Sequence, residues 1–577
     1  MALSIPSGSP AVTIREIDLT GVAPTELANR GAYIGNFQWG PVEEPTLVSN
    51  EAGLVSAFGA PSEATAQDFL SAASFLQYSN ALNIVRVVTT AAKNGYDADA
   101  SGAPTVKNSD NFDAQISTLA AADHTFIAKY PGDIGNSLKV SVCPASTSDS
   151  DFTNWTYASE FPSAPGTSAY VSNVSGTNDE VHVAIIDEDG SFTGSKGSVV
   201  EKFPFLSVAS DAKTSDGSTN YVLDVINNKS RFVWMAGFGS SGVKFDTNAG
   251  SVAGATAFAD DALGVVDVSL VNGVASGTLT TSEIATGVDL ISDPETITID
   301  FIIAPGMTSS ADQITVVNDM LAAVDSVAGR KDCVVITSPA RNDIVNSSTP
   351  VTNAVTTAGS FTSSSYLVVD NNYLKVYDRY NDKYRFVAAA ASTAGLMAAT
   401  ATNSAPWFSP AGQRRGRYLG VAGLSYTPTK SERDTLYNAG INPIANIPGA
   451  GILLYGDKTF LNRPSAFDRI NVRKLFLFLE RAIGRAAKDI LFEFNDEFTR
   501  AEFVGVVEPL LREVQGGRGI TDFLVVCDET NNTPAVIDRN EFVANIFIKP
   551  ARSINYITLN FVAVRTGVAF EEVVGVV

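Results

Sequence analysis

Hydrophobic and polar side chains alternate along the last part of the chain, from Tyr556 to Val564. One side of this segment carries Ile557, Leu559, Phe561 and Ala563, and the other carries Thr558, Asn560 and Val562. A period of two residues predicts a β-strand with one strongly apolar face. The residues beyond it stay apolar to the last position, with Val573, Val574, Val576 and Val577 around one glycine.

A similar pattern occurs near the N-terminus. Val12 and Ile14 alternate with polar residues, and so do Ile17 and Leu19 after a change of phase that a β-bulge would produce. Chain ends usually fray unless other residues hold them, and an unpaired apolar strand promotes aggregation. We therefore expect extended arms at residues 1–22 and 566–577, each paired outside its own subunit.

Strands and helices alternate between residues 31 and 88. The strand-like segment "GAYIGNFQWGP" precedes "SNEAGLVSAFG", whose Ser–Asn start and glycine end are typical of a short helix. "TAQDFLSAASFLQYS" has one apolar helical face, and "LNIVRVV" returns as a strand. The segments "TIDFIIAPG", "SADQITVVNDMLAAVDSVAG" and "DCVVITSPA" repeat this alternation, which predicts the second half of one α/β layer.

The composition changes between about residues 92 and 293. Turn-forming runs such as "STSDSDFTN" and "ASDAKTSDGSTN" separate the strand-like segments "LKVSVCP", "EVHVAIID" and "SRFVWMAGF". This pattern predicts a β-rich insertion with long surface loops. The part after about residue 425 carries most of the charge patterning and most of the helix.

The overall composition narrows the possible partners. A chain of 577 residues is too long for one hydrophobic core, and a formal net charge of −22 argues against nucleic acid or an anionic membrane as the main partner. Cys143, Cys333 and Cys527 lie far apart in apolar runs, so we expect buried thiols and no disulfide framework. Neither a signal peptide nor a membrane span is predicted, which indicates a reducing aqueous compartment.

No candidate catalytic or metal site has the residues that its chemistry requires. The turn "APGMTSS" has one glycine where a dinucleotide fingerprint has three, and "LYGDKT" lacks the upstream glycine of a phosphate loop. His124 and His182 have no ligand-spaced partner, and "DEDGS" at Asp187 lacks the distal acid of a calcium loop. We expect no enzyme activity and no cofactor, although carboxylate pairs remain possible among so many acids.

One helix carries a conspicuous charge pattern. Between Phe467 and Asn495, an apolar face is formed by Val472, Leu475, Leu479, Ile483, Ala486 and Ile490. The opposite face carries four cations within roughly 60° of each other and no acid: Lys474, Arg481, Arg485 and Lys488. Two interpretations stay open, an ordinary solvated face and a socket for an acidic partner.

Several longer motifs resemble the tail sheath protein of large contractile-tailed bacteriophages. They include "FQWGP", "FLQY", "SPAG", "LYGDKT", "FDRINVR", "VCDETNNTPAVIDRNEFVA" and "PARSINYITLNFVAV". The resemblance is nearly continuous over residues 15–88 and 424–567, patchy over 300–420 and thin in the β-rich middle. It implies a structural subunit that polymerises around a rigid inner tube in an extended, high-energy state and then contracts to drive the tube through the host envelope.

The resemblance also implies the partners and the location of the protein. Expected partners are further copies of the chain in hexameric rings or a helical polymer, the tail tube protein, and baseplate and tail terminator proteins. Direct contact with nucleic acid and membrane insertion are not expected. The protein would be assembled in the host bacterial cytoplasm and reside in the virion tail. The arms would complete sheets of neighbouring copies, and the cationic helix face would contact the tube.

The expected fold is α+β and multidomain, with an α/β layer, a C-terminal mixed α/β sheath core, a β-rich outer insertion and extended terminal arms. Besides the arms, the expected parts are the first part of the α/β domain at 23–91, the outward-facing insertion at 92–293, the second part of the α/β domain at 294–424 and the sheath core at 425–565. The alternative is another tail or baseplate protein with a carbohydrate-binding β domain. Its candidate exposed aromatics are Trp155, Phe203, Phe205 and Trp234, which fit a core better.

Overall fold

The computed structural model describes residues 29–146, 150–239, 248–254, 256–258 and 264–555. The residues predicted to form the terminal strands lie outside these ranges: Val12, Ile14, Ile17, Leu19, Ile557, Leu559, Phe561, Val573 and Val574. The pairing of the arms therefore stays a prediction. In the part of the chain that is described, no helix is long and apolar enough to cross a membrane.

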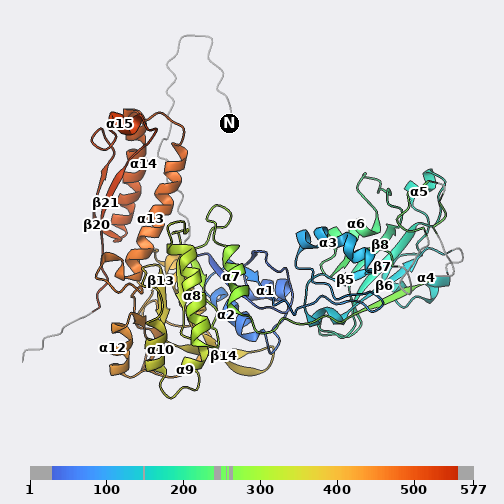
Figure 1. The fold of residues 1–577 in the computed structure, drawn as a ribbon, viewed down its shortest axis with the longest axis horizontal. Coiled ribbons are helices and arrows are strands. Elements are labelled where there is room, and N and C mark those ends of the chain that lie inside the picture. Colours follow the sequence, from blue (N-terminus) through green and yellow to red (C-terminus); the bar gives the residue numbers. More distant parts are fainter. Residues whose placement is uncertain (1–28, 147–149, 240–247, 255, 259–263, 556–577) are drawn as a thin grey trace, which may run out of the picture.

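A seven-stranded sheet, here the first sheet, organises the larger body of the molecule (Figure 1). In spatial order its strands are β17 (Ile441–Asn442), β13 (Leu367–Asp370), β12 (Val334–Thr337), β11 (Phe301–Ile303), β1 (Gly31–Gly35), β3 (Leu82–Arg86) and β2 (Thr46–Val48). All neighbouring pairs are parallel except β2 with β3. The pairing of β1 with β11, where Gly31 lies opposite Phe301, joins segments that the insertion separates.

Helices cover both faces of the first sheet, which explains why its strands are apolar at consecutive positions. Tyr33 packs into the core on one face, while Ala32 and Ile34 pack into the core on the other. The first face is covered by α1 (Glu51–Phe58), α2 (Ala66–Leu76) and α11 (Ala390–Asn403). The second is covered by α7 (Thr281–Asp289), α8 (Ser310–Asp325), α9 (Arg341–Ile344), α10 (Pro350–Ala358) and α12 (Lys430–Asn438).

The predicted limits of the first helix are confirmed. The Asn50 side chain accepts a hydrogen bond from Gly53 N at 2.8 Å, and α1 ends at Gly59, which has a φ of 76°. Two smaller sheets extend this body. One has the order β15 (Lys383–Ala388), β14 (Tyr373–Asp378) and β16 (Val421–Leu424), and the other pairs β18 (Ile444–Ile447) with β19 (Gly451–Leu454).

A second seven-stranded sheet lies at the far end of the molecule and is antiparallel throughout (Figure 1). Its spatial order is β8 (Ser198–Ser207), β7 (Glu180–Asp187), β6 (Leu138–Pro144), β10 (Val266–Val271), β4 (Tyr96–Asp97), β5 (Phe126–Ala128) and β9 (Val233–Met235). Its helices are α3 (Ser109–Ala121), α4 (Ser150–Asn154), α5 (Ala169–Asn173) and α6 (Val222–Lys229), with the short turns η1 (Asp133–Ser137) and η2 (Ala158–Glu160).

The candidate sugar-binding aromatics do not form an exposed cluster. Trp234 is buried and stacks on Phe112 at 4.4 Å between ring centres, and Trp155 is buried against Phe161 at 5.0 Å. Phe203 and Phe205 are partly buried. These contacts support the interpretation of the four aromatics as packing residues of the β-rich part.

A buried arginine connects the two large sheets. Arg86 at the end of β3 donates hydrogen bonds to the carbonyl oxygens of Phe37 and Gly40 in the first body and to that of Pro131 in the β-rich part, at 2.6–2.8 Å. Burial lowers the pKa of Arg86 to about 9. Trp39 packs edge-on against Tyr130 across the same junction, with ring centres 5.3 Å apart. The two bodies are therefore joined by packing as well as by the chain.

Two elements pack on a different domain from the one that the predicted domain limits give them. Helix α7 lies within the predicted insertion 92–293, but Ile284 and Val288 of α7 belong to the core on the first sheet. Strand β17 lies after the predicted limit at 425, yet it pairs with β13 of the first sheet. We therefore assign both elements to the first body, because periodicity identifies an element but not the sheet that receives it.

The last part of the described chain forms a separate module, here the C-terminal module. It contains α13 (Ile470–Asp489), α14 (Glu497–Gly516), β20 (Ile520–Val526), α15 (Pro534–Ile537) and β21 (Asn545–Pro550), preceded by the turn η3 (Ala466–Asp468). Figure 1 shows the two long helices and the strand pair extending away from the first sheet, at the end opposite the β-rich part. Leu475, Leu479, Phe503, Leu511 and Val514 form the centre of its core.

Candidate functional site

The antiparallel pair β20–β21 is a two-stranded sheet with an apolar residue on each surface. Phe523 and Ile548 lie opposite each other and pack toward the helices. Leu524 and Phe547, the next opposed pair, face away and are 58% and 57% exposed. No further described strand pairs with either edge of this ribbon. Two-stranded sheets are marginally stable in water, and their free backbone edges are templates for another strand.

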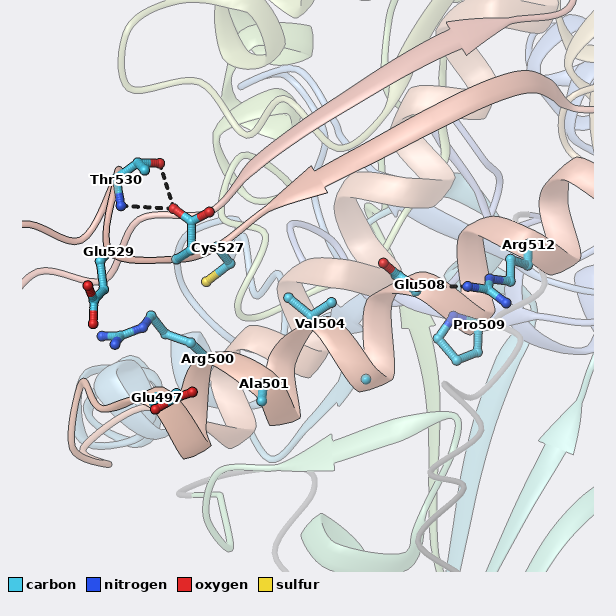
Figure 2. A pocket seen from close by; sticks show the side chains of 12 residues that line it. Glu497, Arg500, Ala501, Val504, Glu508, Pro509, Arg512, Cys527, Glu529 and Thr530 are labelled. Atoms are coloured by element: carbon cyan, nitrogen blue, oxygen red, sulfur yellow. Dashed lines mark hydrogen bonds and ion pairs between the residues drawn. The ribbon is translucent and has the colours of Figure 1, made fainter.

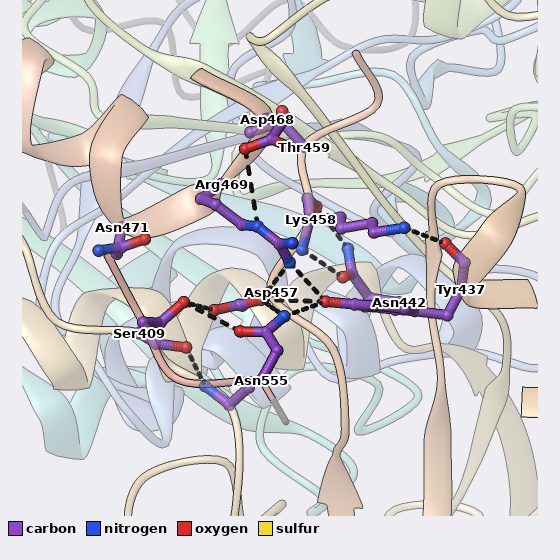
Figure 3. Close-up of polar contacts among 12 residues, drawn as sticks. Ser409, Tyr437, Asn442, Asp457, Lys458, Thr459, Asp468, Arg469, Asn471 and Asn555 are labelled. Carbon is purple, nitrogen blue, oxygen red and sulfur yellow. Dashed lines mark hydrogen bonds and ion pairs between the residues drawn. The ribbon is translucent and has the colours of Figure 1, made fainter. Parts of the chain in front are cut away.

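A polar network holds Ser553 and Asn555, the last part of the chain that the structure describes (Figure 3). The Asp457 carboxylate lies at its centre. It accepts hydrogen bonds from the Arg469 guanidinium at 3.1 Å and from Ser553 Oγ at 2.6 Å. Asn555 Nδ2 donates to Tyr437 Oη at 2.5 Å, and burial, followed by the charge of Asp457, raises the pKa of that phenol to about 12. The motifs "LYGDKT" and "FDRINVR" therefore contact each other here, and together they hold the chain at Ser553 and Asn555.

The lysine of "LYGDKT" is part of this framework and does not form a phosphate loop. Lys458 Nζ donates to the Tyr437 carbonyl oxygen at 2.7 Å, and its main-chain N–H donates to Asn442 Oδ1 at 2.8 Å. The Lys458 ammonium also lies 4.0 Å from the centre of the Tyr437 ring. Burial is the main cause that lowers its pKa. These contacts fix the loop between β19 and α13.

The four cations predicted to share one face of α13 have different surroundings in the structure. Lys474 is only 5% exposed; its ammonium lies 4.2 Å from the centre of the Phe301 ring and makes no hydrogen bond within the described residues. Arg481 pairs with Asp300 at 2.5 Å. Arg485 and Lys488, one and two turns further on, are exposed.

The prediction that all four cations face a partner is therefore wrong for Lys474 and Arg481. Both contact the edge of the first sheet in their own chain, at Asp300 and Phe301. The helical period correctly groups residues that share a face, but it does not show which neighbour covers that face. Arg485 and Lys488 are exposed and stay candidates for contact with another protein.

A groove of about 970 Å³ runs along the exposed side of α14 (Figure 2). Its apolar surface is formed by Ala501, Val504, Pro509 and the buried free thiol of Cys527. Glu497, Arg500, Glu508, Arg512, Asp528 and Glu529 add charged groups of both signs. Within the described part of the chain, no group of three or more His, Cys, Asp or Glu side chains is placed to hold a metal ion. The chemistry of the groove suits contact with polypeptide.

Three family models match successive parts of the chain. The phage tail sheath C-terminal domain matches residues 462–563, and the phage tail sheath protein central domain matches residues 277–460. The N-terminal region of tail sheath protein Gp18 domain III matches residues 30–87. These three matches lie on either side of the β-rich part, which occupies the residues between 87 and 277.

Three relatives resemble the chain over almost its whole length. They are the tail sheath proteins of Vibrio phage KVP40, at 33% identity over 98% of this chain and 99% of the relative, of Enterobacteria phage T4, at 32% over 98% and 99%, and of Salmonella phage ViI, at 31% over 99% and 98%. A crystal structure of a sheath tail protein from Listeria innocua shares the fold, with a TM-score of 0.53 and 12% identity over 91% of this chain and 96% of that chain.

Proposed function

This chain belongs to the phage tail sheath protein family and is a structural subunit of a contractile tail sheath, and we propose that it works by polymerising around an inner tail tube. The polymer would form in an extended, high-energy state in the host cytoplasm. Contraction in the virion tail would then drive the tube through the host envelope. Its partners would be further copies of itself, the tube protein, and baseplate and terminator proteins.

The open ribbon β20–β21 is the observation that carries this proposal. No described strand pairs with either of its edges, which favours strand addition, and the Leu524–Phe547 pair offers apolar surface to a neighbour. The two predicted arms supply strands of matching character. Arms from neighbouring copies would thus turn a marginal two-stranded ribbon into a larger sheet. The energy for contraction would reside in subunit packing, without a nucleotide or cofactor.

The β-rich part would lie on the outside of the polymer. The structure places it at the opposite end of the molecule from the C-terminal module, with the first sheet between them (Figure 1). We assign residues 92–276 to this outer part, because α7 packs on the first sheet.

Assembly of the purified full-length chain tests the proposed function. We expect negative-stain microscopy to show hollow tubes, of a long narrow kind on tail tubes and of a short wide kind without them. A chain that stays monodisperse at high concentration, with or without tail tubes, would contradict the proposal.

The two exposed cations at the end of α13 are proposed to contact the acidic surface of the tube. We expect Arg485→Glu with Lys488→Glu to reduce co-sedimentation with tail tubes severalfold while sparing sheath-only polymers. Each exposed contact is worth only about 0.2–1 kcal/mol, but the contacts repeat along the tail. Raising the salt concentration should weaken tube binding of the unaltered protein, since charges are screened over about 8 Å at physiological ionic strength. Unchanged tube binding in the double variant would assign both residues to an ordinary solvated surface.

A further inference from the structure

The two ends of the C-terminal module differ in chemistry. Helices α13 and α14 have 20 residues each and are therefore about 30 Å long. We call the residues 489–498 and 528–530 the apex, where α13 ends, α14 begins and the β20–α15 loop lies beside them. We call residues 411–420 the base loop. Trp407 holds the base loop near the other end of α14, where its indole N–H donates to the Gly517 carbonyl oxygen at 2.9 Å.

The apex combines exposed aromatic rings with carboxylates. Phe492, Phe494 and Phe498 are 103%, 82% and 84% exposed, which is extreme for apolar residues of this size. Phe492 has a φ of 73°, a left-handed conformation that bulky residues rarely adopt. The exposed carboxylates of Glu493 and Glu529 belong to the same surface, and neither forms an ion pair with a described residue. The apex is therefore an apolar and acidic surface that is exposed among the described residues of the subunit.

The base loop has the opposite charge and a fixed position. Arg414, Arg415 and Arg417 lie within four residues and have no acid between them. Among the described residues, no carboxylate pairs with Arg414 or Arg417, and both are exposed. Arg415 lies 4.9 Å from the centre of the Phe408 ring, and burial, followed by the charge of Arg414, lowers its pKa.

Main-chain hydrogen bonds hold the base loop in place. Gly412 N donates to Leu454 O at 2.9 Å, and Leu454 N donates to Gly416 O at 2.8 Å, so the loop is tied to β19. Leu419 within the loop and Tyr455 next to β19 are 50% and 53% exposed. The base loop thus presents arginines next to apolar surface, which is the counterpart of an acidic and aromatic apex.

We propose that the apex of one copy docks on the base loop of a second copy in the polymer. This inference rests on the proposed function, because it requires the chain to polymerise. Arginines that face exposed phenylalanine rings and carboxylates gain ion pairing and cation–π contact together. Two like ends would repel each other. A contact between different surfaces of identical subunits is heterologous, and such contacts generate rings and helical polymers rather than closed dimers.

Charge reversal at one end and then at both ends tests the contact. The basic-end variant is Arg414→Glu with Arg417→Glu, and the acidic-end variant is Glu493→Lys with Glu529→Lys. Neither glutamate lies in a helix. We expect each variant to raise the critical concentration for tube formation at least about tenfold, equivalent to about 1.4 kcal/mol per contact. The combined variant has the original formal net charge of −22 and restored complementarity, so it should polymerise nearly as the unaltered chain does.

A matched control separates this contact from a general effect of charge. Lys196→Glu with Lys213→Glu makes the same change in net charge as the basic-end variant, on exposed lysines of the β-rich part, and should leave polymerisation unchanged. Circular dichroism checks that every variant folds, and Phe492→Ser with Phe494→Ser tests the apolar part of the apex with no change of charge.

The outcomes distinguish this contact from the proposed function. Normal polymerisation of both single-end variants, or no recovery in the combined variant, would overturn the contact between apex and base loop while tubes of the unaltered chain still support the sheath function. Failure of the unaltered chain to form tubes would overturn both. Weakened tube binding with intact sheath-only polymers would show that the apex meets the tube and not a second copy, and would also overturn the inference.

Discussion

Deletion of residues 566–577 is expected to leave a folded, soluble monomer that forms no tubes, and deletion of residues 1–20 should do the same. Residues 12–19 carry the apolar alternation of an added strand, and residues 566–577 continue the apolar run that follows the alternating residues 556–564. No described strand pairs with the edges of the ribbon β20–β21, which also has an exposed Leu524–Phe547 pair. Arm exchange with docking would produce an interface of standard size, about 1,600 Å². Loss of such an interface removes the main contact between copies without removing a described core residue.

Size-exclusion chromatography, circular dichroism and negative-stain microscopy of the truncated chains measure this effect. As a control, Glu571→Gln with Glu572→Gln keeps the backbone and the apolar side chains of the arm. We expect it to polymerise, because strand addition depends mainly on main-chain hydrogen bonds. Normal tubes from either truncated chain would show that the deleted arm does not connect the subunits.

Replacement of Asp300 by asparagine is expected to destabilise the joint between the first sheet and α13 by about 3–5 kcal/mol. Asp300 is buried and accepts hydrogen bonds from Arg481 at 2.5 Å and from the Arg30 N–H at 2.9 Å. Lys474 lies beside it; burial lowers the pKa of Lys474 to about 8, while the charge of Asp300 acts in the opposite direction. Asparagine keeps the shape of the side chain but removes the negative charge that faces Arg481 and Lys474.

The expected loss of stability is confined to the joint between the first sheet and α13, so the measurement must report on this part of the protein. Hydrogen–deuterium exchange of α13 in the monomer, together with urea unfolding followed by circular dichroism, reports it. The matched control is Asp522→Asn, since Asp522 forms an exposed ion pair with Lys549 at 2.8 Å and should matter by less than about 1 kcal/mol. In the Asp300→Asn background, Lys474→Met should recover part of the stability by removing one uncompensated charge. Equal losses of stability in Asp300→Asn and Asp522→Asn would contradict the proposal that Asp300 stabilises this joint as a buried charge.

Local patterns in the sequence determined the elements and much of the chemistry of this protein. The Ser–Asn start and glycine end fixed α1, and the apolar runs at 31–35 and 301–303 became strands with both faces buried. Cys143, Cys333 and Cys527 are buried free thiols, as their apolar surroundings predict. These features depend on helix caps, periodicity and burial, and each of these can be recognised from residues that are neighbours in the sequence.

Only some features of the ribbon β20–β21 could be predicted from the sequence. The segments "ITDFLVV" and "NIFIKP" contain strand-forming residues, and the resemblance placed them in the core of a sheath subunit. Their mutual pairing, and the exposure of Leu524 and Phe547, depend on which side α13 and α14 occupy. Alternation in strands defines two faces but does not assign one of them to solvent.

The tertiary structure decided which surfaces are available to partners. A helical wheel puts Lys474 and Arg481 on the same face as Arg485 and Lys488, yet the first two meet Phe301 and Asp300, which are more than 170 residues away in the chain. Likewise, α7 and β17 joined the first sheet, although their positions in the chain suggested other domains. The physical reason is the same in each case. A repeat along the sequence records which side chains share a face, whereas the neighbour that covers the face is set by packing between distant segments.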